Sequence, residues 1–362
     1  MTREARESTG KTPHTAPSSL GVLVKPASAD CNLRCQYCFY HRTSDPYLGH
    51  KRRRMSDEVL TELVKQVMAS GAPASFSWQG GEPLLMGLDF YKRVTELQMK
   101  FGRNGQIVGN ALQTNGLLLN DAWCEHLRQF NFLVGLSLDG PPELHNHYRT
   151  FRSGRGSFEH TYRAVDLMRR HQVEFNILAV VNQLTAARPQ LVWDFFVHSG
   201  LVFLQFIPCV ERDPETGKLT EASVSPEAYG EFLCRIFDLW FNNGEPVISV
   251  RFFDNVLMAY LGMAPETCEH KPECGQYVVV EYNGDVYPCD FFVEVEWKLG
   301  NLMERPLHEL AATPLARKFA VIKRGPYAEC AGCQWNFICA NGCPRLRYAP
   351  RGHFEDPHHF CS

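Results

Sequence analysis

The chain has 362 residues, 44% of them hydrophobic, and its 37 Lys and Arg residues nearly balance 40 Asp and Glu residues, for a formal net charge of −3. This composition excludes a globally disordered chain and provides no overall positive field for binding nucleic acid. The longest apolar stretches have the length of strands and fall short of the ~18 residues that a membrane-spanning helix requires, so no membrane partner is expected.

The amino-terminal residues 1–19 are rich in Thr, Ser, Pro and charged residues and lack the apolar core of a signal peptide. They are expected to form a flexible tail, and the protein is expected to remain in the cytoplasm. The chain contains fourteen cysteines. In a reducing compartment, so many cysteines favour metal binding or redox chemistry over a disulfide framework.

Between residues 20 and 242, apolar runs of strand length alternate with helical patterns. The predicted strands are residues 20–25, 75–79, 107–113, 132–138, 175–181 and 202–208. The clearest helix begins at the N-cap Ser56 and ends at Gly71. This alternation predicts a parallel sheet of six βα units, in which the loops at the carboxyl ends of the strands hold the active site.

A helical stretch over residues 226–263 follows, and its second part, residues 243–263, is predicted to connect two domains. Residues 264–362 then contain eight of the fourteen cysteines, more Gly and Pro, and little periodicity. This change in composition predicts a small second domain that is held together by metal rather than by a large apolar core.

Three cysteines, Cys31, Cys35 and Cys38, lie within eight residues directly after the first predicted strand. A four-iron cluster held by three cysteines leaves one iron open to a chelating ligand. Structural zinc usually takes four protein ligands, and no fourth partner lies nearby in the sequence, so zinc is the weaker alternative. Unligated core cysteines are the remaining alternative.

The C-x3-C-x2-C spacing with trailing aromatic residues, together with the Gly-Gly-Glu-Pro segment after the second strand, resembles the radical S-adenosylmethionine (SAM) superfamily. The resemblance implies a partial (β/α)6 TIM-like barrel of the radical SAM type. It also implies that the three cysteines hold a 4Fe-4S cluster whose open iron binds S-adenosylmethionine. An electron from the cluster then cleaves the cofactor to a 5'-deoxyadenosyl radical, and the protein positions and shields it.

The same resemblance assigns a set of residues to the cofactor, most of them just after predicted strands. They are Tyr40, Gln79, Gly80, Gly81, Glu82, Ser137, Arg149 and Val210. Purely structural roles are the alternatives for several of these residues. The glycine segment could be a plain turn, Ser137 a helix cap, Arg149 a surface residue, and Val210 a packing residue.

The carboxy-terminal cysteines follow the pattern of a SPASM domain, with G-x4-C ending at Cys289, then C-x2-C-x5-C-x3-C over residues 330–343 and a final cysteine. The resemblance implies two further 4Fe-4S clusters, giving three in all. One ligand set would be Cys268, Cys274, Cys289 and Cys343, and the other Cys330, Cys333, Cys339 and Cys361. Fully ligated clusters suit electron transfer. A zinc ribbon at the first C-x2-C pair is the alternative.

Asp290 follows Cys289 directly, which puts a carboxylate beside a predicted cluster ligand. A carboxylate can act as a general base when it lies within hydrogen-bond reach of the proton, although a surface Asp is the alternative on position alone. The cysteine spacing and this Cys-Asp pair together resemble the anaerobic sulfatase-maturating enzymes, from about residue 20 onward. In that family the Asp is the catalytic base, and a Cys or Ser in a Cys/Ser-x-Pro-x-Arg motif becomes Cα-formylglycine.

This resemblance implies a sulfatase polypeptide as substrate and a cytoplasmic electron donor such as flavodoxin or ferredoxin. A radical SAM/SPASM enzyme that forms a thioether, a carbon-carbon crosslink or an epimer in a ribosomally made peptide is the alternative. The short polar segment ahead of the barrel weighs against it. A non-enzymatic iron-sulfur carrier would leave the Gly-Gly-Glu-Pro segment without a purpose.

The cysteines outside the cluster motifs, Cys124, Cys209 and Cys234, are expected to be buried packing residues. His353, His358 and His359 are expected to form an exposed tail, because eight cysteines already supply the ligands.

Overall fold

The computed structural model describes residues 21–41, 46, 47, 49, 50, 53–71, 73–213, 216–347, 354 and 357–361. The predicted tail at residues 1–19 lies outside these ranges, as does His353. No helix among the described residues is long and apolar enough to cross a membrane.

Six parallel strands form the amino-terminal part of the sheet, and each lies within one residue of its predicted limits. They are β1 (Gly21–Lys25), β2 (Ala74–Trp78), β3 (Val108–Thr114), β4 (Leu133–Ser137), β5 (Phe175–Val181) and β6 (Phe203–Pro208). The predicted class, a partial (β/α)6 barrel, is confirmed. The strands were predictable from short apolar runs, whose residues are buried along β1 and at alternate positions of β5.

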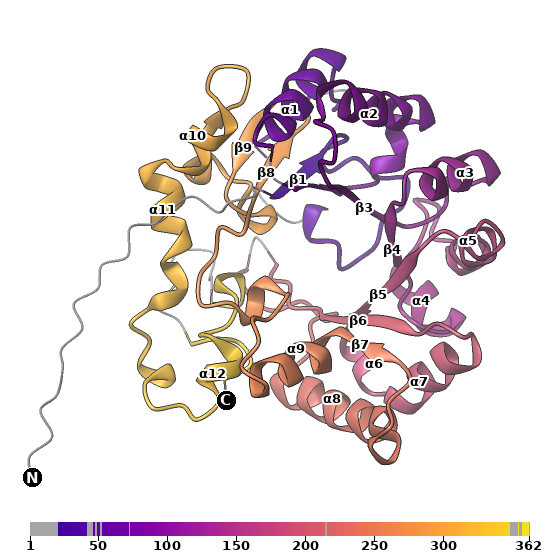
Figure 1. The fold of residues 1–362 in the computed structure, drawn as a ribbon. Coiled ribbons are helices and arrows are strands. Elements are labelled where there is room, and N and C mark those ends of the chain that lie inside the picture. Colours follow the sequence, from indigo (N-terminus) through magenta and orange to yellow (C-terminus); the bar gives the residue numbers. More distant parts are fainter. Residues whose placement is uncertain are drawn as a thin grey trace, which may run out of the picture.

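The helices that accompany these strands lie on the outer side of the sheet (Figure 1). They are α1 (Asp57–Ala69), α2 (Leu88–Phe101), α3 (Asp121–Gln129), α4 (Pro142–Tyr148), α5 (Phe158–Arg170), α6 (Gln183–Ala186), α7 (Pro189–His198) and α8 (Pro226–Phe241). Helix α1 begins as predicted, because the Ser56 hydroxyl accepts a hydrogen bond from the Val59 amide. Its apolar face, which includes Leu63 and Val64, is buried.

The carboxy-terminal part continues the same sheet. Its elements are β7 (Ser249–Val250), α9 (Arg251–Tyr260), β8 (Tyr277–Glu281), β9 (Asp285–Tyr287), β10 (Gly300–Asn301), α10 (Leu307–Ala311), α11 (Pro314–Ala320) and α12 (Asn336–Cys339). The sheet order is β10-β9-β8-β1-β2-β3-β4-β5-β6-β7. Strand β8 pairs in parallel with β1, with Glu281 opposite Lys25, and β9 returns antiparallel.

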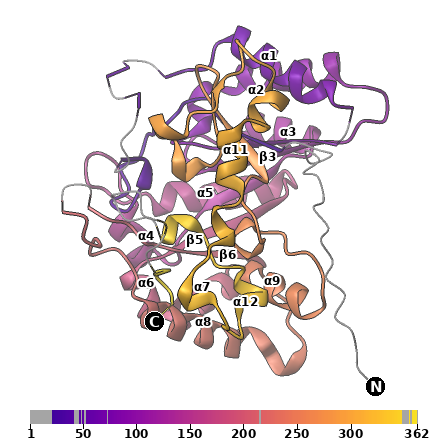
Figure 2. The same ribbon diagram turned by 90° about the vertical axis from the view of Figure 1, so that its left-hand side faces the viewer.

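The strands lie on an open arc, and α10, α11 and α12 lie on its open side, opposite α3 and α5 (Figure 1). Figure 2 shows α11 and α12 in front of β5 and β6 when this side faces the viewer. The carboxy-terminal cysteines therefore lie beside the barrel rather than in a detached unit.

The expected helical stretch over residues 226–263 is interrupted between α8 and α9. Helix α8 ends at Phe241, since Asn242, Asn243 and Gly244 all have positive φ angles, of 41°, 56° and 91°. This conformation suits Asn and Gly and stops a helix. A short strand, β7, then adds to the edge of the sheet before α9 begins.

Two expectations about single residues are wrong. Cys234 is exposed, whereas Cys124 and Cys209 are buried as expected. The buried face of α8 carries Phe232 and Ile236, and a residue midway between them points to the opposite face. His358 is buried rather than exposed in a tail.

A close approach between two loops fixes the mouth of the barrel beside β1. The amide of Gly81 donates to the Ser28 carbonyl oxygen, and the amide of Glu82 donates to the Asp30 carbonyl oxygen, both at 2.7 Å. A Cβ atom added at Gly81 would lie 2.1 Å from the Asp30 carbonyl oxygen. Gly80 has a φ of +124°, which L side chains rarely adopt. The two glycines are therefore required by backbone contact.

We predict that Gly81→Ala lowers the free energy of unfolding by about 1–3 kcal/mol, because the loops must separate to admit the methyl group. Gly230→Ala is the matched control, since Gly230 lies in α8 with open space at its Cβ position. That variant should gain about 0.5–1 kcal/mol. Anaerobic denaturant unfolding measures both, and equal stability of Gly81→Ala and wild type would contradict the contact.

Candidate functional site

The three cysteines after β1 lie in a loop that is anchored to the segment after α4. The Arg34 amide donates to the Thr150 carbonyl oxygen, and the Gln36 amide donates to the Tyr148 carbonyl oxygen. All three thiols are free of disulfides. Burial raises the pKa of Cys31 and of Cys38 to about 12, and the charges of the neighbouring cysteines add to this. The structure thus brings three partly buried thiols together at one loop.

Glu82 joins the glycine loop to the end of β3. Its buried carboxylate accepts hydrogen bonds from Thr114 Oγ1 at 2.8 Å and from the backbone amides of Asn115 at 2.9 Å and Leu84 at 3.0 Å. Burial raises the pKa of Glu82 to about 7, against these donors. Because donors from the protein occupy the Glu82 carboxylate, Glu82 supports the loop after β3 rather than facing the cofactor cavity. Asn115 in that loop reaches the cysteine loop, with its amide group 3.7 Å from Cys31 Sγ.

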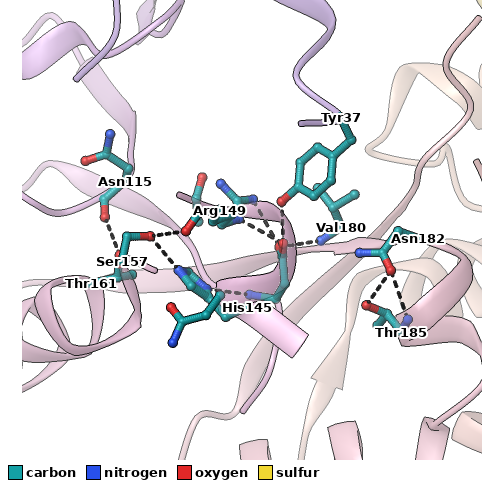
Figure 3. A network of polar contacts seen from close by, with 12 residues as sticks. Tyr37, Asn115, His145, Arg149, Ser157, Thr161, Val180, Asn182 and Thr185 are labelled. Carbon is teal, nitrogen blue, oxygen red and sulfur yellow. Dashed lines mark hydrogen bonds and ion pairs between the residues drawn. The ribbon is translucent and has the colours of Figure 1, made fainter. Parts of the chain in front are cut away.

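Arg149 takes part in a buried network at the carboxyl end of β4 (Figure 3). Its Nε and Nη2 atoms bind the two oxygens of Asp139 at 2.9 and 3.0 Å. Asp139 also accepts from the Tyr37 hydroxyl and from the Val180 amide, the latter at 2.9 Å. The guanidinium lies near Cys35; burial raises the pKa of this thiol and Arg149 opposes the rise. Arg149 is therefore a buried ion-pair partner beside the cysteine loop, not a surface residue.

A second layer of the network holds the Asp139 loop. His145 Nδ1 accepts from the Asp139 amide at 3.4 Å, and its Nε2 lies 3.0 Å from the Ser157 hydroxyl. Ser157 in turn donates to the Arg149 carbonyl oxygen at 2.9 Å. Burial lowers the pKa of His145 to about 3. The neutral imidazole is thus a structural link between the two ends of the Arg149 loop.

The other residues assigned to the cofactor lie at the ends of their strands. Ser137, the last residue of β4, accepts a hydrogen bond from the Gln113 amide group at 2.9 Å. Val210 is buried just after β6. Next to it, Glu211 pairs with Arg345, whose guanidinium lies 4.2 Å from the ring centroid of Phe291. These contacts join the mouth of the barrel to the segment that follows Cys343.

Asp290 is 5% exposed and lies between the barrel and the carboxy-terminal hairpin. Its Oδ2 accepts from the Tyr40 hydroxyl at 2.5 Å and from the Gln79 amide group at 3.2 Å. Its Oδ1 lies 3.4 Å from the ammonium of Lys25. Asp290 and Gln79 line a cavity of about 350 Å³ that extends along β1 and β2. Tyr40 and Gln79, assigned by sequence to the cofactor, thus contact the predicted base.

The eight carboxy-terminal cysteines fall into two groups. One group, lining a single cavity, is Cys268, Cys274, Cys289 and Cys343. Burial raises the pKa of all four, and the charges of Cys268 and Cys343 raise it further at Cys274 and Cys289. In the other group, burial raises the pKa of Cys339 and Cys361, and the charge of Cys330 raises both further. The assignment of the two groups to two separate clusters stays a prediction.

These residues fit iron-sulfur clusters. Soft thiolates are the usual ligands of such clusters, and every thiol in the two groups and the cysteine loop is free of disulfides. Hydrogen-bonding groups reach sulfurs in the cysteine loop and in both carboxy-terminal groups. The Leu33 amide lies 3.4 Å from Cys31 Sγ, Tyr277 Oη lies 3.7 Å from Cys289 Sγ, and Arg347 Nη2 lies 3.1 Å from Cys330 Sγ. Among the described residues, no three His, Cys, Asp or Glu side chains gather at the spacing of a single metal ion.

Comparisons with known proteins agree with this geometry. The model of the radical SAM superfamily matches residues 26–188, and that of an iron-sulfur cluster-binding domain, SPASM, matches residues 268–334. A cysteine-type anaerobic sulfatase-maturating enzyme of Clostridium perfringens is 39% identical over 346 residues, which cover 94% of this chain and 93% of the relative. The chain belongs to the anaerobic sulfatase-maturating enzyme family. The match to an iron-sulfur domain argues against the zinc-ribbon alternative.

Other members of the anaerobic sulfatase-maturating enzyme family show the same likeness. A serine-type enzyme of Bacteroides thetaiotaomicron is 38% identical over 347 residues, covering 91% of this chain and 84% of the relative. The solved structure of anSMEcpe with bound AdoMet has a TM-score of 0.89 at 38% identity and covers 94% of both chains. The structure of SuiB bound to S-adenosylmethionine, at 17% identity and a TM-score of 0.66, shares the fold.

Sequence analysis missed several residues of this sulfatase-maturating enzyme site. Lys25 and Glu281 form a buried ion pair next to Asp290, and Asp139 organises the Arg149 loop. Their motif signals are weak, because a single Lys or Glu at the end of an apolar strand resembles an ordinary strand terminus. The pairing of β1 with β8, which brings Lys25 and Glu281 together, is visible only in the fold.

We predict that acid destabilises the protein partly through His145. Its folded pKa lies below the unfolded value of 6.5, so its contribution is complete above pH 6.5 and is lost as the pH falls toward 3. The loss is about 1.4 kcal/mol for each pH unit in this window. Denaturant unfolding at pH 7.5 and 5.5 should show a smaller fall for His145→Gln than for wild type. Identical falls would contradict the buried neutral imidazole.

Proposed function

We propose that this chain oxidises a Cys or Ser in a Cys/Ser-x-Pro-x-Arg motif of a sulfatase polypeptide to Cα-formylglycine. The observation that carries the proposal is the place of Asp290, which is buried in the cavity between the two parts of the chain and directly follows Cys289. Family membership supports it, as does the solved structure of anSMEcpe with bound AdoMet and the Cp18Cys peptide, at a TM-score of 0.88 and 38% identity.

In this proposal, Cys31, Cys35 and Cys38 hold a 4Fe-4S cluster with one open iron for S-adenosylmethionine. When bound, the cluster and cofactor supply the 5'-deoxyadenosyl radical that removes a hydrogen atom from the β-carbon of the substrate residue. The backbone of the Gly80–Gly81 loop, Ser137 and Arg149 would hold the methionine and ribose portions, and Val210 would pack against the adenine. Arg149 keeps its orientation through the bidentate pair with Asp139.

Asp290 accepts the proton of the substrate thiol or hydroxyl. Tyr40 and Gln79 hold its Oδ2, which leaves Oδ1 as the oxygen that accepts no hydrogen bond of good geometry from the described residues. A general base needs hydrogen-bond reach to the proton and a fixed orientation. The three contacts from β1, the cysteine loop and the end of β2 supply that orientation.

The second electron of the oxidation leaves through the carboxy-terminal cysteines. The inner group, at Cys268, Cys274, Cys289 and Cys343, and the outer group, at Cys330, Cys333, Cys339 and Cys361, would each hold a fully ligated 4Fe-4S cluster, and such clusters would serve as electron acceptors. Because Cys289 precedes Asp290, proton and electron acceptors lie next to each other. A flavodoxin or ferredoxin in the cytoplasm serves as the external electron carrier. The alternative of a ribosomal-peptide-modifying enzyme rests on a likeness in fold alone.

The direct test is anaerobic incubation of reconstituted protein with S-adenosylmethionine, a reductant and a synthetic peptide. A peptide of ~18 residues is long enough to contain the motif and its flanking residues. One peptide should carry Cys-x-Pro-x-Arg and another Ser-x-Pro-x-Arg. Mass spectrometry should find the aldehyde in at least one peptide. Cofactor cleavage without an aldehyde in either peptide would overturn the proposed function.

We predict that Asp290→Asn separates cofactor cleavage from product formation. The amide keeps the size of the carboxylate but cannot take up the proton, so formylglycine yield should fall by ~10²-fold or more while 5'-deoxyadenosine still forms. Quantifying both products and the iron content in one reaction provides the test. A near wild-type aldehyde yield would exclude the base role, and a loss of iron would assign Asp290 to the support of Cys289.

We predict about twelve irons per chain after reconstitution, four for each of three clusters. Replacing Cys31, Cys35 and Cys38 with Ala should remove about four of them and abolish cofactor cleavage. Cys124→Ala is the matched control, because this buried cysteine lies in α3 away from the ligand groups. Metal analysis measures both variants. Full iron content in the triple variant, or zinc in the carboxy-terminal part, would contradict the assignment.

A further inference from the structure

A buried ion pair joins the barrel to the carboxy-terminal hairpin. Lys25 ends β1 and Glu281 ends β8, and the two residues are direct neighbours in the parallel register. The Lys25 ammonium lies 2.8 Å from Glu281 Oε1, and the two residues are 3% and 0% exposed. Removing two charges from water costs several kcal/mol per ion, and an apolar pair of similar volume is often as stable. Stability alone therefore does not explain this pair.

Besides Glu281, the Lys25 ammonium has two further neighbours among the described residues. It lies 3.4 Å from Asp290 Oδ1 and 4.7 Å from the centre of the Tyr40 ring. Tyr40 donates to the other oxygen of the same carboxylate, as does Gln79. Lys25, Tyr40 and Gln79 therefore contact Asp290 from separate elements, and Lys25 is the one that faces Oδ1.

We infer that Lys25, held in place by Glu281, is a positioning residue for the Asp290 carboxylate in the oxidation of the substrate residue. This inference rests on the proposed function, in which Asp290 is the base. Tyr40 and Gln79 both donate to Oδ2. Two donors to one oxygen leave the carboxylate able to rotate about its Cβ–Cγ bond. The ammonium at Oδ1 fixes that rotation, and Glu281 fixes the ammonium. A reacting group must be held to within about 0.5 Å of its productive geometry.

A purely structural role makes a different prediction. If Lys25 and Glu281 only fasten β8 to β1, their loss lowers stability or cluster content and leaves the ratio of formylglycine to 5'-deoxyadenosine unchanged in the protein that remains. A positioning role lowers this ratio, because the radical still forms whereas the oxidation is not completed. The ratio is therefore the measurement that separates the two roles.

The test uses Lys25→Met combined with Glu281→Leu in the full-length, reconstituted protein. The double change removes both charges of the ion pair, so that Glu281 is not left buried without a partner, which Lys25→Met alone would do at a cost of about 3–5 kcal/mol. Asp290 keeps its two neutral donors, Tyr40 and Gln79. We expect wild-type iron content, a KM for the peptide within about twofold of wild type, and a product ratio that is lower by ~10-fold, below the full loss expected without the base. If the double variant loses iron, Lys25→Met with Glu281→Gln retains a polar group on β8 and makes the same comparison.

Lys298→Met is the matched control. Lys298, in the segment between β9 and β10, lies 2.7 Å from Asp285 of β9, so its loss also breaks an ion pair beside the hairpin, but one that does not include Asp290. Its product ratio should equal that of wild type. Glu281→Gln alone leaves the ammonium beside Asp290 but removes the charge that fixes it, so its ratio should fall by less than that of the double variant. A wild-type ratio in this variant would overturn the part of the inference that assigns Glu281 to holding Lys25.

A double variant with full iron content and a wild-type product ratio would overturn the inference while leaving the proposed function intact. Absence of the aldehyde in the wild-type reaction would overturn both the inference and the proposed function. The wild-type reaction alone shows this outcome, so it is distinguished from a failure of the inference without any variant. A lowered ratio in Lys298→Met equal to that of the double variant would also overturn the inference, because the effect would then follow from any broken ion pair in the hairpin.

Discussion

Five residues of β8 pair with five residues of β1, and this parallel pairing makes one sheet out of two parts of the chain that are far apart in sequence. The antiparallel return through β9 then ends at Cys289 and Asp290. As a result, a carboxylate from the carboxy-terminal part contacts Tyr40 in the cysteine loop and Gln79 at the end of β2. The register of one strand pair thus decides whether the predicted base and the predicted radical site face the same cavity.

Burial of the thiols places a second constraint on the molecule. Without metal, burial and neighbouring sulfurs raise the pKa values of cysteines in the loop and in both carboxy-terminal groups. Thiolates are the ligand form, so cluster binding must release these protons and is favoured by higher pH. Donors such as Tyr277 and Arg347 lie against sulfur atoms, where they can stabilise the ligated thiolates.

Much of this architecture could be predicted from the sequence, because its signals are local. Strand positions follow from short apolar runs and the cysteine motifs follow from spacing, whereas the division of the carboxy-terminal cysteines into two groups follows from the resemblance to SPASM domains. Other features depend on contacts between distant segments. The expected helical stretch over 226–263 is interrupted at Asn242 and Asn243, which have a left-handed backbone. Tyr40 and Gln79 could be placed near the cofactor loop by motif, but their bonds to Asp290 depend on the β1–β8 register, which no local pattern encodes.

The arrangement of the sheet also limits how the chain can be divided. Strand β1 is buried between β2 and β8, and its side chains include Val22, Leu23 and Val24. A barrel cut away from its carboxy-terminal part would expose the backbone groups of this apolar strand along a free edge, which is a template for pairing with another chain. If the cluster-bearing part is exchanged between related proteins, the incoming part must therefore carry a strand that pairs with β1 in the same register and in the same, parallel direction. The barrel and the carboxy-terminal part are distinct in sequence, but the hydrogen bonds between β1 and β8 join them in one sheet.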